Sequence, residues 1–155
     1  MQKIEIDNID RKILRLLQAD ASLSATAIGE QVGLSQSPCW RRIQRLKQTG
    51  LIREQGLVID RRKLGFDTMV FAHVKLTAHG RSKVAEFGDT IRQFPEVLEC
   101  HLLLGHVDFL LRIVVPDLEA YERFFFERLS QLPDVQEVTS SIALTEVKHT
   151  TALPI

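Results

Sequence analysis

The length, composition and charge of this chain are those of a globular protein made of one or two small domains. It has 155 residues, of which 45% are hydrophobic and 26% charged, and such a chain can bury a core. Two cysteines, Cys39 and Cys100, are too few and too far apart for a disulfide framework or a CxxC metal site. We expect both to be small core residues of a protein in a reducing, cytoplasmic compartment.

Neither membrane insertion nor secretion is predicted. The longest mostly apolar stretch, residues 109–115, contains Arg112 and is far shorter than the roughly 20 residues that a membrane span needs. The opening MQKIEIDNIDRK alternates charge with isoleucine and has no apolar signal-peptide core. We therefore expect no membrane partner.

The charges are balanced overall but unevenly distributed. The formal net charge is zero, yet residues 41–63 hold eight basic residues and only two acidic ones. An electropositive segment in an otherwise mildly acidic chain is typical of a two-part protein in which one part meets nucleic acid. The eight basic residues are Arg41, Arg42, Arg45, Lys47, Arg53, Arg61, Arg62 and Lys63.

The first 50 residues predict three short helices. Isoleucine and leucine recur at helical spacing over residues 6–18, and Asp7 is placed to cap this helix. A second helix over residues 25–32 has Ser24 as its cap and Gly33 just beyond its end, where positive φ is needed.

The third helix begins after Ser35, which can cap it, and has Pro38 in its first turn. Its apolar stripe is Cys39, Ile43 and Leu46, and it ends at Gly50 in a Schellman motif that brings Leu51 against Leu46. The second and third helices are joined by a three-residue turn that contains glycine. This arrangement is typical of a helix-turn-helix.

After a predicted linker strand over residues 53–60 and the basic residues 61–63, a boundary falls at Leu64 and Gly65. We therefore divide the chain into a helix-turn-helix domain (1–52), a linker and hinge (53–65) and a second domain (66–155).

The second domain alternates strand and helix patterns. We predict strands over 68–76, two within 97–115 and one over 135–151, with helices through 84–94 and from Leu118 onward, the latter capped by Asp117. The order β-α-β-β-α-β gives a ferredoxin-like domain and an α+β fold class overall. In the second helix we expect Phe125 in the core and Phe124 or Phe126 against another subunit, with a second core layer as the alternative.

Several blocks together resemble the Lrp/AsnC (leucine-responsive, "feast/famine") family of transcription regulators, over essentially the whole chain. These are the start IDRKILRLLQ, the block GLSQSPCWRRIQRLKQTGLI and the hairpin sequence GHVDFLL. The resemblance implies a winged or plain helix-turn-helix, a linker strand and a ferredoxin-like domain that dimerises through its sheet, often assembles to octamers, and binds amino acids.

The third helix is the candidate DNA-binding surface, although a solvated charged face is the plainer interpretation of most such helices. We expect Gln36, Ser37, Arg41 and Gln44 at base edges, and the remaining basic residues on phosphate. Trp40 either packs against the first helix or a neighbouring subunit, or makes apolar contact with DNA. Relatives commonly carry proline where this chain has Gln36. The predicted DNA-binding residues are Ser35, Gln36, Ser37, Trp40, Arg41, Arg42, Gln44, Arg45 and Lys47.

The hairpin bend around Gly105 and Asp108 is the candidate effector site. Asp108 could simply cap its own loop, whereas the resemblance places this bend in a pocket between subunits where an amino acid binds. Relatives often have an acidic residue at the position of His106. The residues that the resemblance implies are Gly105, His106, Val107 and Asp108, with Ser140, Ser141, Ile142 and Ala143 as the other wall.

Metal binding and catalysis are not expected. Cys100 and His101 are adjacent in a strand and point to opposite faces, and the chain has no phosphate-binding glycine loop or nucleophile motif. We predict a non-enzymatic, sequence-specific DNA-binding regulator of amino-acid metabolism, without a cofactor, that forms a homodimer, tetramer or octamer and responds to an amino acid bound between subunits. The alternatives are an architectural DNA-wrapping protein with no effector, or a small-molecule-binding or enzymatic ferredoxin-like module.

Overall fold

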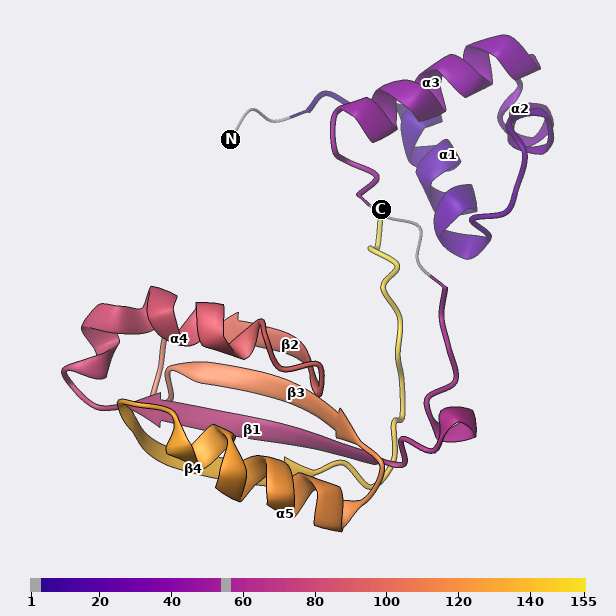
Figure 1. Cartoon of the computed structure of the whole chain (residues 1–155). Helices are drawn as coiled ribbons and strands as arrows, with labels where there is room; N and C mark the ends of the chain where they lie inside the picture. The colour runs from indigo at the N-terminus through magenta and orange to yellow at the C-terminus, as the bar shows by residue number, and fades with distance from the viewer. Residues whose placement is uncertain (1–3, 54–56) are drawn as a thin grey trace. The chain divides into compact units, whose positions relative to one another are not determined.

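The computed structural model describes residues 4–53 and 57–155, which fold as two compact units (Figure 1). The helical unit comprises the chain up to Val58 together with Lys148–Ile155, and the sheet unit is Ile59–Val147. This division differs from the expected one at its far end. Residues 148–155 were assigned to the second domain, but they pack with the first three helices.

The helical unit contains α1 (Asn8–Ala19), α2 (Ala25–Val32) and α3 (Gln36–Gln48). The predicted caps at Asp7 and Ser24 are confirmed, because each side chain accepts a hydrogen bond from the backbone N–H three residues later. Gly33 has φ +76°, as expected after α2. Ser35 occupies the cap position of α3, but its side chain makes no capping hydrogen bond.

The predicted Schellman ending of α3 is confirmed. Leu51 N donates to Leu46 O at 3.1 Å and Gly50 N donates to Lys47 O at 2.9 Å, with Gly50 at φ +73°. These two bonds satisfy carbonyl groups that would otherwise lack partners at the helix end. The end of α3 is thereby fixed by local chemistry.

A small core holds the three helices together. Its fully buried members include Ile13 from α1, Ile28 from α2, and Cys39 and Leu46 from α3. The turn between α2 and α3 packs closely on Gly29: a Cβ added there would lie 2.5 Å from Leu34 O, and Leu34 N donates to Gly29 O at 2.8 Å. Only a residue without a side chain allows this approach.

We expect Gly29→Ala to destabilise the helical unit by about 1–3 kcal/mol, because the added methyl group meets backbone atoms that cannot move independently. Thermal unfolding followed by circular dichroism measures the loss. Gly88→Ala is the matched control: Gly88 is also helical, and a Cβ there has nothing within 4 Å. If both variants melted at the same temperature, the close approach at Gly29 would make no measurable contribution to stability.

The predicted linker strand is wrong for the part that the structure describes. Arg53 and residues 57–60 lie outside any strand, while 54–56 lie outside the described residues. Leu57 and Val58 are each 91% exposed. An extended segment becomes a strand only when it pairs with another, and no such pairing occurs here in the described residues of a single chain.

The sheet unit confirms the predicted βαββαβ order and the ferredoxin-like arrangement. Its strands pair antiparallel in the order β2-β3-β1-β4. The strands are β1 (Thr68–Leu76), β2 (Val97–Leu102), β3 (Phe109–Val115) and β4 (Val135–Ile142), with helices α4 (Val84–Ile91) and α5 (Leu118–Glu127). Short 3-10 turns lie at Arg62–Leu64, Gly80–Lys83 and Leu129–Gln131.

One face of the sheet is buried by both helices. Alternate residues of the central strands, such as Ala72 and Leu111, pack against Phe87 of α4 and Phe124 of α5. On the other face of β1, Phe71, His73 and Lys75 are half-buried, and Met69 is buried at 4% exposure. The sheet unit therefore has one covered and one open face.

Two expectations about this unit are wrong. The last strand ends at Ile142 rather than at residue 151, because its partner β1 begins at Thr68 and offers nothing beyond. Cys100 is exposed, since it lies on the edge strand β2. Phe125 packs against the core as expected, although it is only half-buried. Phe124 is also core at 4% exposure, which agrees with the alternative of a second core layer, and Phe126 is 59% exposed.

Within the residues that the structure describes, no helix has both the length and the apolar character required to cross a bilayer.

Candidate functional site

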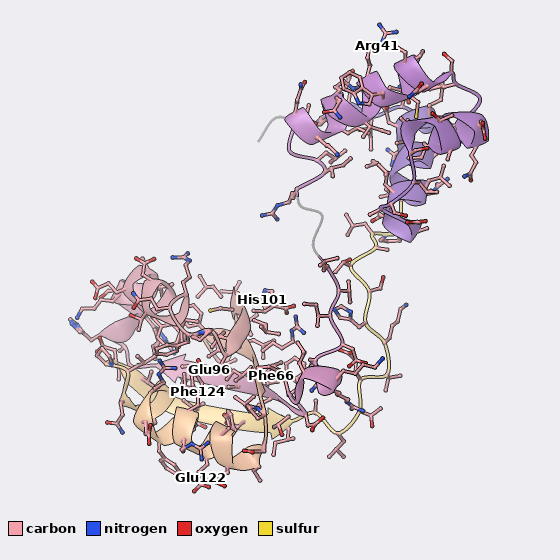
Figure 2. All side chains as sticks on the ribbon, turned by 45° about the vertical axis from the view of Figure 1, so that its right-hand side comes forward. Arg41, Phe66, Glu96, His101, Glu122 and Phe124 are labelled. Carbon is pink, nitrogen blue, oxygen red and sulfur yellow. The ribbon has the colours of Figure 1, made fainter. Side chains whose placement is uncertain are left out.

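The outward face of α3 gathers the side chains predicted to meet DNA. Gln36, Ser37, Trp40, Arg41 and Lys47 are exposed, and Gln44 is half-buried. They recur every three or four residues, so they share one side of the helix, while Cys39, Ile43 and Leu46 pack the other side into the core. Figure 2 shows Arg41 pointing away from α1 and α2.

Trp40 is 54% exposed, so most of its ring is not used for packing within the helical unit. An aromatic side chain left in water on this face costs hydrophobic stabilisation that a partner surface could recover. The exposure favours a role for Trp40 in contact with another molecule.

Two of the four basic residues of α3 are tied to the start of α1. Asp10 is 1% exposed. Its Oδ1 accepts from Arg42 Nη1 at 2.8 Å, and its Oδ2 accepts from Arg45 Nη2 and, at 3.1 Å, from the backbone N–H of Asp7. Arg42 Nη1 also lies 2.7 Å from Asp7 Oδ2. We call Asp7, Asp10, Arg42 and Arg45 the aspartate-arginine network.

The network shifts the pKa of two side chains, Asp7 and Arg42. The backbone N–H of Asp10 and the Arg42 guanidinium lower the pKa of Asp7, and hydrogen bonds to Asp7 and Asp10 raise the pKa of Arg42. Because the folded-state pKa of Asp7 is lowered, its stabilisation is present above the unfolded-state pKa and is lost as pH falls through the folded-state value. The contribution of the Asp7–Arg42 ion pair is therefore lost in acid.

The network also separates the basic residues of α3 into two that are paired with carboxylates and two that are not paired with any described carboxylate. Arg41 and Lys47 have no carboxylate partner within the described parts of the chain, whereas Arg42 and Arg45 do. Arg45 remains 51% exposed and Arg42 30%, so their predicted phosphate contacts would have to be made while Asp10 holds them. Arg41 and Lys47 are the side chains with an unshared charge.

Asp108, in the predicted effector loop, already has partners for both carboxylate oxygens. Its Oδ2 accepts from Leu76 N at 2.7 Å and its Oδ1 lies 3.2 Å from Arg81 Nε. The Asp108 main chain is also fixed: its N–H donates to Val74 O at 2.9 Å, and its carbonyl accepts from Leu103 N at 2.8 Å. These contacts favour the capping role, in which Asp108 closes the end of β1 and shapes the loop.

We expect Asp108→Ala to lower the stability of the sheet unit by about 1–3 kcal/mol without any ligand present, because it leaves the N–H of the buried Leu76 unsatisfied. Unfolding in urea measures this. Asp89→Ala is the matched control, because Asp89 forms a surface ion pair with Arg92 and is 71% exposed. Equal stability of the two variants would contradict the capping role.

The loop that Asp108 holds offers free backbone groups. In the portion of the chain that the structure describes, the N–H groups of Gly105, His106 and Val107 donate to no acceptor. Gly105 and His106 are exposed. A bend with several unpaired N–H groups can hold an anionic group such as a carboxylate.

The two predicted walls of the effector site do not meet within one chain. The loop 105–108 lies at the Leu76 end of β1, where Asp108 contacts Val74 and Leu76. The segment 140–143 lies along the other half of β1, from Ala72 in the middle, which pairs with Ser140, to Met69, whose carbonyl accepts from Ala143 N. Among the described residues, no hydrogen bond or ion pair joins the two segments.

The second wall is also divided between the two faces of the sheet. Ser140 faces the helices and its Oγ lies 2.5 Å from the Tyr121 hydroxyl, whereas Ser141 pairs with Phe71 on the open face. Burial raises the pKa of Tyr121, and the Ser140 hydrogen bond opposes this. Ser140 is thus committed to a contact inside the unit.

The open face of the sheet carries a charged group across β2 and β3. Arg112 Nη2 donates to Glu99 Oε1 at 2.5 Å, and His101 Nε2 lies 3.3 Å from Glu99 Oε2. Burial raises the pKa of Glu99, but Arg112 and His101 outweigh it and the pKa is lowered overall. His101 is on this face and Cys100 on the other, and the described residues contain no group of three metal-binding side chains.

Sequence reasoning missed the residues that act by holding others. No role was predicted for Asp10 or for Arg81. The Asp7–Asp10 spacing is that of a capping box and could have been found. The contacts of Asp10 with Arg42 and Arg45 join residues more than 30 positions apart, and no local signal marks them.

A helix-turn-helix joined to a ferredoxin-like domain with an exposed polar loop is the architecture of a DNA-binding regulator with a ligand-binding domain. Two family models match this chain: the AsnC-type helix-turn-helix domain over residues 6–47, and the Lrp/AsnC ligand-binding domain over residues 69–153. The second match alone covers more than half of the chain.

Whole-chain relatives agree. The chain is 36% identical to the DNA-binding transcriptional activator DecR of Escherichia coli, over 97% of this chain and 99% of that one. It is also 36% identical to the transcriptional regulator AzlB of Bacillus subtilis, over 98% and 97%. This chain belongs to the Lrp/AsnC family of transcription regulators of amino-acid metabolism.

Solved structures support the same assignment. An AsnC-family regulator from Agrobacterium tumefaciens superposes with a TM-score of 0.89 at 38% identity, covering 96% of this chain and 97% of that one. A transcriptional regulator from Neisseria meningitidis, solved as a complex with L-methionine, gives a TM-score of 0.91 at 33% identity and covers 97% of both chains.

Proposed function

We propose that this protein recognises specific DNA sites through the outward face of α3, as a dimer or larger assembly of identical chains in the cytoplasm, and that it has no catalytic role. The observation that carries the proposal is the composition of that face. Amide, hydroxyl and guanidinium groups stand there free of partners in the described chain, and they are the groups that read base edges in the major groove.

The aspartate-arginine network indicates that the residues of this face make different kinds of contact with DNA. Arg41 has a free guanidinium that can pair with guanine, and Gln36, Ser37 and Gln44 can reach neighbouring bases. Lys47 supplies an unshared charge for phosphate. Ser35, Arg42 and Arg45 are assigned to the DNA backbone, with the two arginines oriented by Asp10.

We infer that the effector is an amino acid bound between chains. The support is threefold: the match to a ligand-binding domain, the L-methionine in the Neisseria relative, and the position of the two predicted walls along different halves of β1. The loop 105–108 would hold the carboxylate through its free N–H groups, and residues 140–143 of a second chain would close the site. Asp108 shapes the loop in this account.

Self-association follows from the same reasoning. The open face of the sheet leaves Phe71 and its neighbours uncovered by any helix of the sheet unit, and the linker residues Leu57 and Val58 are exposed. Apolar surface of this kind is commonly buried between subunits. Dimerisation would present two copies of α3 to half-sites about one helical turn of DNA, or a multiple of it, apart.

Footprinting on the DNA upstream of the protein's own gene tests the proposal. We expect discrete protected segments that recur at helical-turn spacing and change when L-methionine or another amino acid is added. Uniform protection of every fragment, unchanged by any amino acid, would contradict it and favour an architectural DNA-wrapping protein.

A further inference from the structure

The last residues of the chain are packed onto the helical unit. Strand β4 ends at Ile142 in the sheet unit, but Lys148–Ile155, which we call the tail segment, belongs to the helical unit. Ile155 is half-buried against the same apolar cluster that contains Ile13 and Leu14 of α1. DNA recognition by the outward face of α3 does not require this contact.

The contact is made by side chains of α1 on the main chain of the tail segment. Leu153 N donates to Gln18 Oε1 at 2.6 Å, and Gln18 Nε2 donates to Leu153 O at 3.2 Å. Arg15 Nε donates to Ile155 O. The Gln18 amide thus pairs with one residue of the tail segment in the way that a neighbouring strand would.

The side chain of Leu153 is not what holds it. Leu153 is 67% exposed, so its position is set by the two main-chain hydrogen bonds to Gln18, while Ile155 supplies the apolar contact. Gln18 therefore binds the main chain of Leu153 through one donor and one acceptor, and the core binds the side chain of Ile155 two residues later. Together these contacts define a small docking site for an extended segment.

We propose that α1 carries a docking site, formed by Arg15, Gln18 and the adjoining core, for the chain's own tail segment, and that the docked tail is a second tether between the helical unit and β4. The first tether is the linker that contains residues 57 and 58. Because the tail segment is covalently attached, docking is intramolecular and a few modest contacts suffice.

The tether would let the effector site influence DNA binding, an inference that rests on the proposed function. Ala143, in the predicted effector wall, is only five residues before Lys148. Residues 140–142 are held in β4, so a ligand would act on Ala143 and the residues just beyond the strand. Restricting that segment would restrict the start of the tail, and with it the freedom of α1 and of α3 packed on α1. The effector site and the DNA-binding helix would be coupled because the tail restrains both, and this coupling requires no change of fold.

Docking is tested by spin labels on the full chain. With Cys100→Ser to remove the exposed thiol, labels at Lys12→Cys on α1 and Thr151→Cys on the tail segment should give a short, narrow distance distribution by pulsed electron paramagnetic resonance. Gln18→Ala should broaden it, and the matched control Gln31→Ala, an exposed glutamine of α2, should not. A broad distribution in the parent chain would overturn docking.

The same labels identify whose tail is bound. A mixture of chains labelled only at Lys12→Cys with chains labelled only at Thr151→Cys should lack the short distance. If the short distance occurred in that mixture, the occupant would be the tail of a second copy, and the tether within one chain would be overturned.

The regulatory step is tested by a chain shortened to end at Ala152. We expect its affinity for a footprinted DNA fragment to fall about tenfold, because the helical unit loses one of its two restraints. Unchanged affinity, with docking seen by spin labels, would overturn the coupling. If the full chain bound no DNA at all, the proposed function would fail, while the label distances would still decide docking.

Discussion

Replacing Asp10 by asparagine is expected to destabilise the helical unit by about 3 kcal/mol. This is the smallest loss that is typical when one partner of a buried ion pair is removed and the other is left without its counter-charge. Asparagine keeps the shape of the side chain but removes the charge that Arg42 and Arg45 share. The free energy of unfolding of a small domain is only about 5–15 kcal/mol in total. Urea unfolding of the intact chain should therefore show an early transition in the helical unit, and DNA affinity should fall with it.

The control for this variant is Asp7→Asn. Asparagine is as good a helix cap as aspartate, so this change removes only an ion pair in which Asp7 is 51% exposed. We expect a much smaller effect on unfolding and little change in DNA binding. If Asp10→Asn were as mild as Asp7→Asn, the aspartate-arginine network would not be what orients α3.

Replacing Arg41 by alanine is expected to weaken binding to a specific DNA site by about 1–3 kcal/mol, or roughly 5- to 150-fold, and to relax discrimination at one base pair. The reason is that Arg41 is exposed and has no carboxylate partner in the described chain, so its guanidinium is available to guanine. Stability should not change. Fluorescence anisotropy with a set of single-base operator variants measures both effects.

Lys47→Ala provides the contrast. A phosphate contact carries no sequence information, so this variant should weaken binding to all the operator variants equally and lower the slope of affinity against salt by about 1. Arg92→Ala, in an ion pair of the sheet unit, should leave DNA binding unchanged. If Arg41→Ala behaved as Lys47→Ala does, Arg41 would be a phosphate contact and base reading would lie elsewhere on α3.

Those parts of the fold that depend on local chemistry could be predicted from the sequence. Caps such as Ser24 and Asp117, and the glycine turn at Gly50, each act within a few residues of where they stand, and each lies where the pattern indicated. Strand β1 was predicted with its observed bounds because one of its faces is continuously buried. The family could be recognised because several such blocks occur together.

What could not be predicted depends on partners distant in sequence. The end of β4 is set by where β1 begins, and the packing of Ile155 on α1 joins opposite ends of the chain. The burial of Phe124 beside the half-buried Phe125 depends on how α5 packs against the sheet. Periodicity alone carries none of this information.

The candidate site shows the same division. The exposed residues of α3 follow from the helix period, so Arg41 and Gln36 could be placed in advance. The roles of Asp10 and Arg81 could not, because each pairs with a residue in another element. The sequence left two interpretations of Asp108 open, and the contact of its carboxylate with Leu76 N favours the capping one; its share in effector binding stays a prediction.

The central claim, sequence-specific recognition by α3, is tested most directly by competition at physiological salt. A footprinted fragment labelled with a fluorophore is bound by the protein and displaced by the same unlabelled fragment or by one of shuffled sequence. We predict that the shuffled competitor must be present at about 1,000-fold higher concentration or more, as for specific regulators in general. Equal displacement by both fragments would contradict the account and identify a protein that binds DNA by charge and shape alone.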